Sequence, residues 1–146
     1  MNLNCIILHV EDDDNDSFFF QRALGAVFFV GSYRRVPDVK AAMLYLAGDA
    51  HYSDRHLFPL PNVLVVDSSP HQTGKSVNDL LAWLKPRDEF KNLVKVALTG
   101  GTDPKAREAL LSQGVAGVLS KGASFPEFAL AVADILGRYA IPDAGE

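Results

Sequence analysis

Carboxylate, hydroxyl and ammonium side chains stand directly after four apolar runs of the sequence. In chain order, these residues are Glu11, Asp12 and Asp13, then Asp67, then Thr99, then Ser120 with Lys121. In a parallel sheet covered by helices, ligands bind beyond the carboxyl ends of the strands, near the point where the strand order reverses. If the four runs are strands of such a sheet, these carboxylates and hydroxyls converge with the ammonium at one edge.

This combination of groups predicts a site for a divalent cation and a phosphoryl group. Clustered carboxylates repel one another unless a cation neutralises them, and an oxygen-only set suits Mg²⁺, which also accepts phosphate oxygens. A carboxylate can itself act as the nucleophile and form an aspartyl phosphate. Asp67 is the best candidate for that role because it ends the clearest buried run, Val63–Val66. Thr99 and Lys121 are expected to bind phosphoryl oxygens, since the transfer needs charge neutralisation there.

The elements that must position these residues alternate between short apolar runs and longer amphipathic segments. Strands are expected at 5–10, 28–33, 63–66, 93–98 and 115–119. Helices are expected at about 15–27, 37–46, 76–85, 103–114 and 124–138. Strict alternation of strands and helices favours an α/β fold with right-handed crossovers. We therefore expect a flavodoxin-like, doubly wound parallel sheet of five strands in the order 2-1-3-4-5, with helices on both faces.

Individual residues predict where some helices begin, end and pack. Asn15 or Asp16 is expected to cap the first helix, with Phe18, Phe19, Ala23 and Val27 as core positions. Pro37-Asp38 should open the second helix and Gly48 should close it. Asp13, Asp14 and Asp16 are interpreted as loop and cap residues rather than metal ligands. His9 and Cys5, inside the first run, are interpreted as packed core residues.

Composition excludes several classes of function. The 146 residues suit one domain over 1–146, with a frayed tail at about 141–146. A net charge of −4 without a cluster of Lys and Arg argues against nucleic-acid binding. No apolar run approaches the roughly 20 residues of a membrane span. The single cysteine, together with an N-terminus unlike a signal peptide, favours a reducing, cytoplasmic location.

At four places the sequence resembles the receiver domains of two-component response regulators. The matching blocks, in order, are 6–13 with Asn15-Asp16, 62–67, 96–99 and 114–121. Together they cover nearly the whole chain at suitable separations. The segments 45–48 and 52–55, with Pro61, are similar to the small receivers that serve bacterial phytochrome kinases.

The resemblance implies a stand-alone response regulator in a phosphorelay, a phosphoacceptor switch rather than a conventional enzyme. Asp67 would accept a phosphoryl group from a histidine kinase or phosphotransfer protein. Glu11 and Asp12 would be the acidic pair, with Asp12 the direct Mg²⁺ ligand, and Ser69 would contribute a backbone carbonyl. Output would be binding in trans, to a kinase, a phosphotransfer protein, a downstream target or a second copy in a homodimer.

Three departures from the family pattern keep alternatives open. The loop after Asp67 is one residue short, because Pro70 and Gly74 come one position early. Gly122 replaces the usual proline after the lysine, and Val118 replaces the aromatic residue that reports the switch. A pseudo-receiver that acts only as a protein-binding module is therefore the second hypothesis. An unrelated small hydrolase or flavin protein of similar fold is the third.

Overall fold

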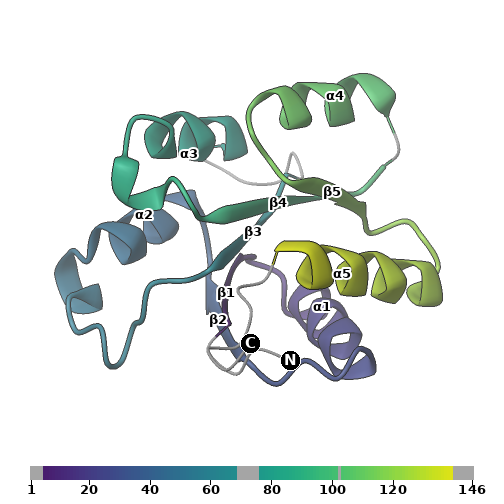
Figure 1. Cartoon of the computed structure of the whole chain (residues 1–146), viewed down its shortest axis with the longest axis horizontal. Helices are drawn as coiled ribbons and strands as arrows, with labels where there is room; N and C mark the ends of the chain where they lie inside the picture. The colour runs from purple at the N-terminus through teal and green to yellow at the C-terminus, as the bar shows by residue number, and fades with distance from the viewer. Residues whose placement is uncertain (1–4, 69–75, 102, 140–146) are drawn as a thin grey trace.

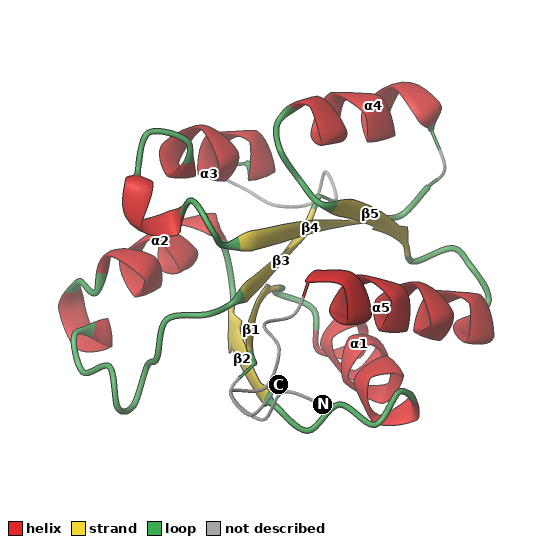
Figure 2. Ribbon diagram, viewed as in Figure 1, coloured by secondary structure: helices red, strands yellow, loops and turns green. Residues whose placement is uncertain are grey.

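A five-stranded parallel sheet forms the centre of the molecule (Figures 1 and 2). The computed structural model describes residues 5–68, 76–101 and 103–139. The strands are β1 (Ile6–Val10), β2 (Ser32–Val36), β3 (Val63–Asp67), β4 (Val94–Thr99) and β5 (Gly117–Ser120). Their order is β2-β1-β3-β4-β5, which confirms the predicted flavodoxin-like topology. The order reverses between β1 and β3, and their carboxyl ends are where that topology places a ligand.

Helices cover both faces of the sheet (Figure 1). They are α1 (Asp14–Ala26), α2 (Val39–Ala47), α3 (Val77–Leu84), α4 (Pro104–Ser112) and α5 (Phe125–Tyr139), with short 3₁₀ helices at Ala50–Tyr52 and Asp88–Phe90. One apolar cluster joins the sheet to α1 and α5, and a second joins it to α2 and α3. Strand β3 is buried at every position, as its uninterrupted apolar run predicts.

Strand β2 begins four residues later than predicted. Phe28 and Phe29 still belong to the turn that ends α1, since their amides bond to Gly25 and Leu24. Phe28 has a φ of 59° and is 82% exposed. The strand itself contains Arg34 and Arg35 and is only partly buried. As an edge strand it pairs with β1 alone, so it can contain polar residues. A search for apolar runs therefore does not detect it.

The first helix begins and packs differently from the prediction, whereas the second follows it. Asp13, not Asn15 or Asp16, caps α1 by accepting from the amide of Asp16 at 2.9 Å. Within α1, Phe20 is 3% exposed and Phe18 is 63% exposed, so the prediction of Phe18 as core was wrong.

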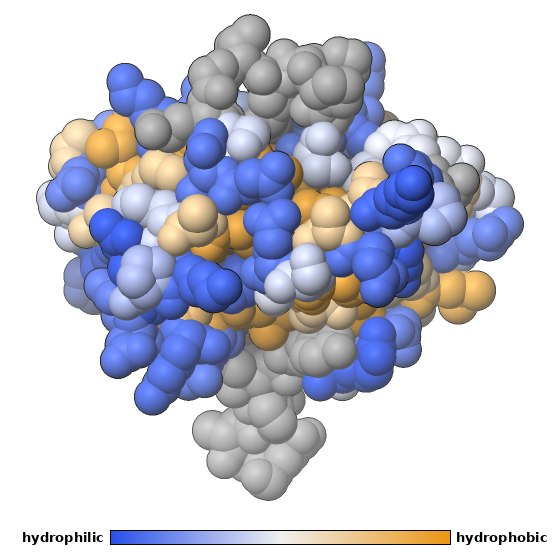
Figure 3. Space-filling model, turned by 90° about the horizontal axis from the view of Figure 1, so that it is seen from above, coloured by the Kyte–Doolittle hydropathy of each residue, from blue (hydrophilic) through white to orange (hydrophobic). Residues whose placement is uncertain are grey.

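In α2, Asp38 caps the beginning, and Gly48 ends the helix with a φ of 73°, a conformation that favours glycine. Among the described residues, no helix combines the length and apolar character needed to cross a bilayer. The face in Figure 3 is largely hydrophilic, with hydrophobic side chains visible between the polar ones.

Candidate functional site

The carboxyl ends of β1, β3, β4 and β5 bring side chains from distant parts of the chain to one edge of the sheet. The parallel register pairs Val10 with Val66, and Asp67 with Leu98. It also pairs Thr99 with Ser120. Glu11, Asp67, Thr99 and Lys121 therefore end up on neighbouring strand tips, as the positions after the apolar runs predict.

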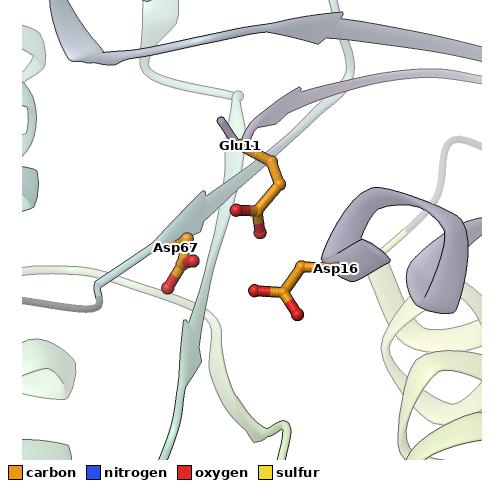
Figure 4. A group of neighbouring side chains, drawn as sticks. All are labelled: Glu11, Asp16 and Asp67. Carbon is orange, nitrogen blue, oxygen red and sulfur yellow. The ribbon is translucent and has the colours of Figure 1, made fainter. Parts of the chain in front are cut away.

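Three carboxylates form an acidic group at this edge (Figure 4). Glu11 follows β1, Asp67 ends β3, and Asp16 lies in the first turn of α1. One oxygen from each lies within 4.8 Å of the others, and Figure 4 shows the three side chains pointing into a common space. Glu11 and Asp67 are buried, at 0% and 2% exposed, while Asp16 is partly exposed.

Lys121 supplies the positive charge that partly balances this group. Its Nζ donates to Asp16 Oδ2 and to Asp67 Oδ2, at 2.8 Å each. Burial disfavours the ammonium, but these two hydrogen bonds outweigh that effect and raise the pKa of Lys121 to about 12. The backbone contributes as well, because the Lys121 amide donates to Thr99 O at 2.8 Å and so fixes the lysine beside β4.

Glu11 is the carboxylate whose surroundings most require a cation. Burial, together with the nearby negative charge of Asp67, raises the pKa of Glu11 to about 8. Its Oε2 accepts weakly from the Asp13 amide at 3.3 Å. Its buried Oε1 has no hydrogen-bond partner among the described residues. A buried oxygen without a partner beside two further carboxylates fits a hard, oxygen-binding cation such as Mg²⁺.

The hydroxyl of Thr99 is currently engaged with its own loop. It donates to Gly101 O at 2.8 Å. Next to it lies a cavity of about 270 Å³ between α4 and the ends of β4 and β5, lined in part by Ser68, Arg107 and Val118. Arg107 donates to the backbone oxygen of Val118 at 3.0 Å.

The sequence identified Glu11, Asp67 and Lys121 as members of this group, and it missed Asp16. Asp12 is exposed and stands outside the three-carboxylate group. Asp16 joins the group because Asp13 caps the helix, so that Asp16 lies in its first turn and reaches back towards the sheet. The sequence did contain a signal for a further site residue: five acidic residues fall within positions 11–16, which is more than one helix cap requires. Ser69, Pro70 and Gly74 lie outside the described residues.

His9 is buried against the same group. Its ring lies 4.8 Å from that of Phe20, centroid to centroid, in the α1-facing core, as expected for a packed residue. Burial lowers the pKa of His9 to about 3, so the imidazole is neutral near neutral pH. Its Nδ1 lies 2.7 Å from the hydroxyl of Tyr33.

Comparison of the sequence with protein-family models and with curated proteins finds no match. Solved structures are similar over almost the whole chain. A response regulator in red light signalling of R. palustris is 21% identical with a TM-score of 0.82, and the match covers 93% of this chain and 94% of that one.

A phosphorylated cyanobacterial phytochrome response regulator, RcpA, is 21% identical with a TM-score of 0.77 and the same coverage. The Mn²⁺-bound response regulator Rcp1 is 24% identical with a TM-score of 0.76, covering 94% of this chain and 97% of that one. The chain therefore has the fold of response-regulator receiver domains.

Proposed function

We propose that the chain is a phosphoacceptor switch, the receiver of a two-component phosphorelay, with Asp67 as the acceptor. One observation carries the proposal: Asp67 is 2% exposed at the end of the central strand, bonded to Lys121 at 2.8 Å and grouped with two more carboxylates. A merely structural ion pair does not need the additional buried carboxylate Glu11. A phosphoryl site does, because Glu11 and Asp67 together can hold a divalent cation.

In the proposed step, an oxygen of the Asp67 carboxylate attacks the phosphorus of a phosphohistidine on a partner protein. An oxygen–phosphorus bond forms as the phosphorus–nitrogen bond breaks, and its electron pair returns to the partner's imidazole. Lys121 stays protonated and shifts from the Asp67 carboxylate to a phosphoryl oxygen. The chain supplies position and charge rather than proton transfer, which is what phosphoryl transfer requires.

The residues present fit Mg²⁺. Glu11 and Asp67 are the proposed ligands from β1 and β3, and Asp16 lies close enough to bind directly or through water. Asp12 and the backbone carbonyl of Ser69 remain predicted ligands. Mg²⁺ would neutralise the carboxylates and two of the phosphoryl oxygens.

Thr99 is the proposed link between the phosphoryl group and the protein surface. To donate to a phosphoryl oxygen, its hydroxyl must leave Gly101 O, and the loop after β4 must follow. The cavity beside Val118 gives that loop space. The new charge would thereby bias a two-state surface around α4. Because Val118 is not aromatic, this surface would change without the rotation of an aromatic ring.

The proposed partners are a sensor histidine kinase or a phosphotransfer protein in the cytoplasm, and a second copy of the chain. Beyond phosphotransfer and hydrolysis of its own phosphoryl group, no further enzymatic activity is proposed. Two of the similar solved structures are phytochrome response regulators, which supports a kinase of that class as the first donor to test.

The test is acetyl phosphate with Mg²⁺, read by intact mass. The parent should gain one phosphoryl group, and Asp67→Asn should gain none. Asp49→Asn is the matched control, since Asp49 is exposed and makes no side-chain cap bond; it should label like the parent. Labelling of Asp67→Asn at the parental level would refute the assignment of Asp67.

A pseudo-receiver that binds partners without phosphorylation is the second candidate, favoured by Val118 and by the engaged hydroxyl of Thr99. Titration with Mg²⁺ and beryllofluoride, a phosphoryl mimic, separates the two. Chemical-shift changes around the acidic group support the switch, and an unchanged spectrum supports the binding module.

A further inference from the structure

A chain of hydrogen bonds runs from the surface of α1 to the buried acidic group. Gln21 Nε2 donates to Ser17 Oγ at 3.1 Å. Ser17 Oγ lies 2.8 Å from the hydroxyl of Tyr33, and that hydroxyl lies 2.7 Å from His9 Nδ1. The other ring nitrogen, His9 Nε2, lies 3.7 Å from Glu11 Oε1. The chain therefore joins α1, β2 and β1 to a carboxylate of the proposed site.

The last two atoms of this chain are both buried and both lack a partner. His9 and Glu11 side chains are 0% exposed. Within the described part of the molecule, His9 Nε2 and Glu11 Oε1 are the buried side-chain atoms without a hydrogen bond. Unsatisfied buried polar atoms are rare. A small rotation of the carboxylate that shortens 3.7 Å to about 2.9 Å would satisfy both atoms with one bond.

Once a bound cation keeps Glu11 ionised, the types of the groups decide the direction of every bond in the chain. An ionised carboxylate only accepts, so His9 must donate to it through a hydrogen on Nε2. In a neutral imidazole Nδ1 then accepts, which makes Tyr33 the donor to His9. Ser17 in turn donates to Tyr33 and accepts from the amide nitrogen of Gln21, which can only donate. Each bond then has one donor and one acceptor, whereas the opposite tautomer turns a lone pair towards an anion.

We propose that His9 is a positioning residue for the cation site: its neutral Nε2–H donates to Glu11 Oε1 and orients that carboxylate for Mg²⁺. The inference rests on the proposed function, because it needs Glu11 ionised and bound to the cation. Partners that orient a metal ligand from outside typically change metal affinity by about 10- to 100-fold when they are removed. His9 thus acts through Glu11 and does not touch the cation.

The competing interpretation is that His9 only fills space in the core beside Phe20. An apolar residue of similar size would then serve as well. The two interpretations differ in two measurable quantities: the tautomer of His9 and the affinity for Mg²⁺.

The tautomer is read from long-range ¹H–¹⁵N correlations of the ¹⁵N-histidine-labelled full chain saturated with Mg²⁺. The His9 signals are identified by their absence in His9→Gln. We expect hydrogen on Nε2 in the parent and a mixture of tautomers in Tyr33→Phe, which removes the donor to Nδ1. Hydrogen on Nδ1 in the Mg²⁺-bound parent would overturn the proposal.

The affinity is measured by calorimetric titration with Mg²⁺ at fixed pH. His9→Leu and Tyr33→Phe should each weaken binding, His9→Leu by about tenfold. His9→Gln should restore most of the affinity, because its amide can donate from the position of Nε2. The control is Tyr45→Phe, which loses a buried hydroxyl bonded to Pro59 O at 2.7 Å but is remote from the acidic group; its affinity should be parental.

The outcomes distinguish the role of His9 from the proposed function. If the parent binds Mg²⁺ and His9→Leu binds it equally well, the positioning role is wrong and the proposed function stands. If the parent itself does not bind Mg²⁺, the proposed function fails, and the role of His9 falls with it. Should His9→Leu not fold, Tyr33→Phe carries the affinity test, and unchanged binding there overturns the proposal.

Discussion

Replacing Glu11 by glutamine should stabilise the metal-free protein, and the gain should grow with pH. The pKa of Glu11 rises from its ordinary value of 4.5 to about 8 in the folded chain. The folded state therefore binds the extra proton between these values, and its stability falls as the pH rises through this window. Glutamine is nearly isosteric with the protonated side chain and has no such dependence.

The magnitude follows from the two pKa values. Keeping Glu11 protonated in the folded chain, while the unfolded chain ionises it, costs about 1 kcal/mol of stability at pH 5 and about 3 kcal/mol at pH 7. The free energy of unfolding of Glu11→Gln should exceed that of the parent by these amounts. His9 acts in the opposite direction: burial lowers its pKa from 6.5 to about 3, so stability rises with pH between those values. That contribution is about 2 kcal/mol from pH 5 to pH 7, so the parent should vary little over this range.

The assay is urea unfolding followed by circular dichroism at pH 5, 6 and 7 with a chelator present. The difference between parent and variant isolates Glu11, because His9 is common to both. Glu108→Gln, an exposed substitution in α4, is the control and should stay within about 0.5 kcal/mol of the parent at each pH. A difference between Glu11→Gln and the parent that does not change with pH, or a less stable variant at pH 7, would refute the reasoning.

Three further predictions use the same contacts. Below pH 8, Mg²⁺ binding should release one proton from Glu11 and strengthen about tenfold per pH unit; calorimetry in buffers of different ionisation enthalpy measures that proton. Lys121→Met should remove phosphoryl uptake and lower metal-free stability by about 2 kcal/mol, because two nearby carboxylates lose their ammonium; urea unfolding and intact mass measure the two effects. Phe20→Ala should cost about 3–5 kcal/mol, whereas Phe18→Ala should stay within about 0.5 kcal/mol; equal losses in thermal unfolding would contradict the observed orientation of α1.

Much of the architecture was predictable because buried segments are recognisable in the sequence by their apolar residues. Strand β3 lies between two helical layers, so Val63–Val66 is apolar throughout, and the next residue, Asp67, is at the sheet edge. Asp38 and Gly48 mark the ends of α2 through local backbone chemistry that needs no tertiary contact. Strand β2 has a weaker apolar pattern, because an edge strand is only partly buried.

What the sequence could not determine depends on how separate elements dock. Apolar periodicity shows which face of a segment is buried, but it does not show which side chain from another element comes to meet it. Asp16 enters the acidic group only because α1 begins at its observed position beside β1 and β3. The chain of Gln21, Ser17 and Tyr33 likewise forms only when α1 packs over β2. Hydrogen bonds and ion pairs act over about 3 Å, so contacts between residues far apart in sequence are decided by tertiary packing.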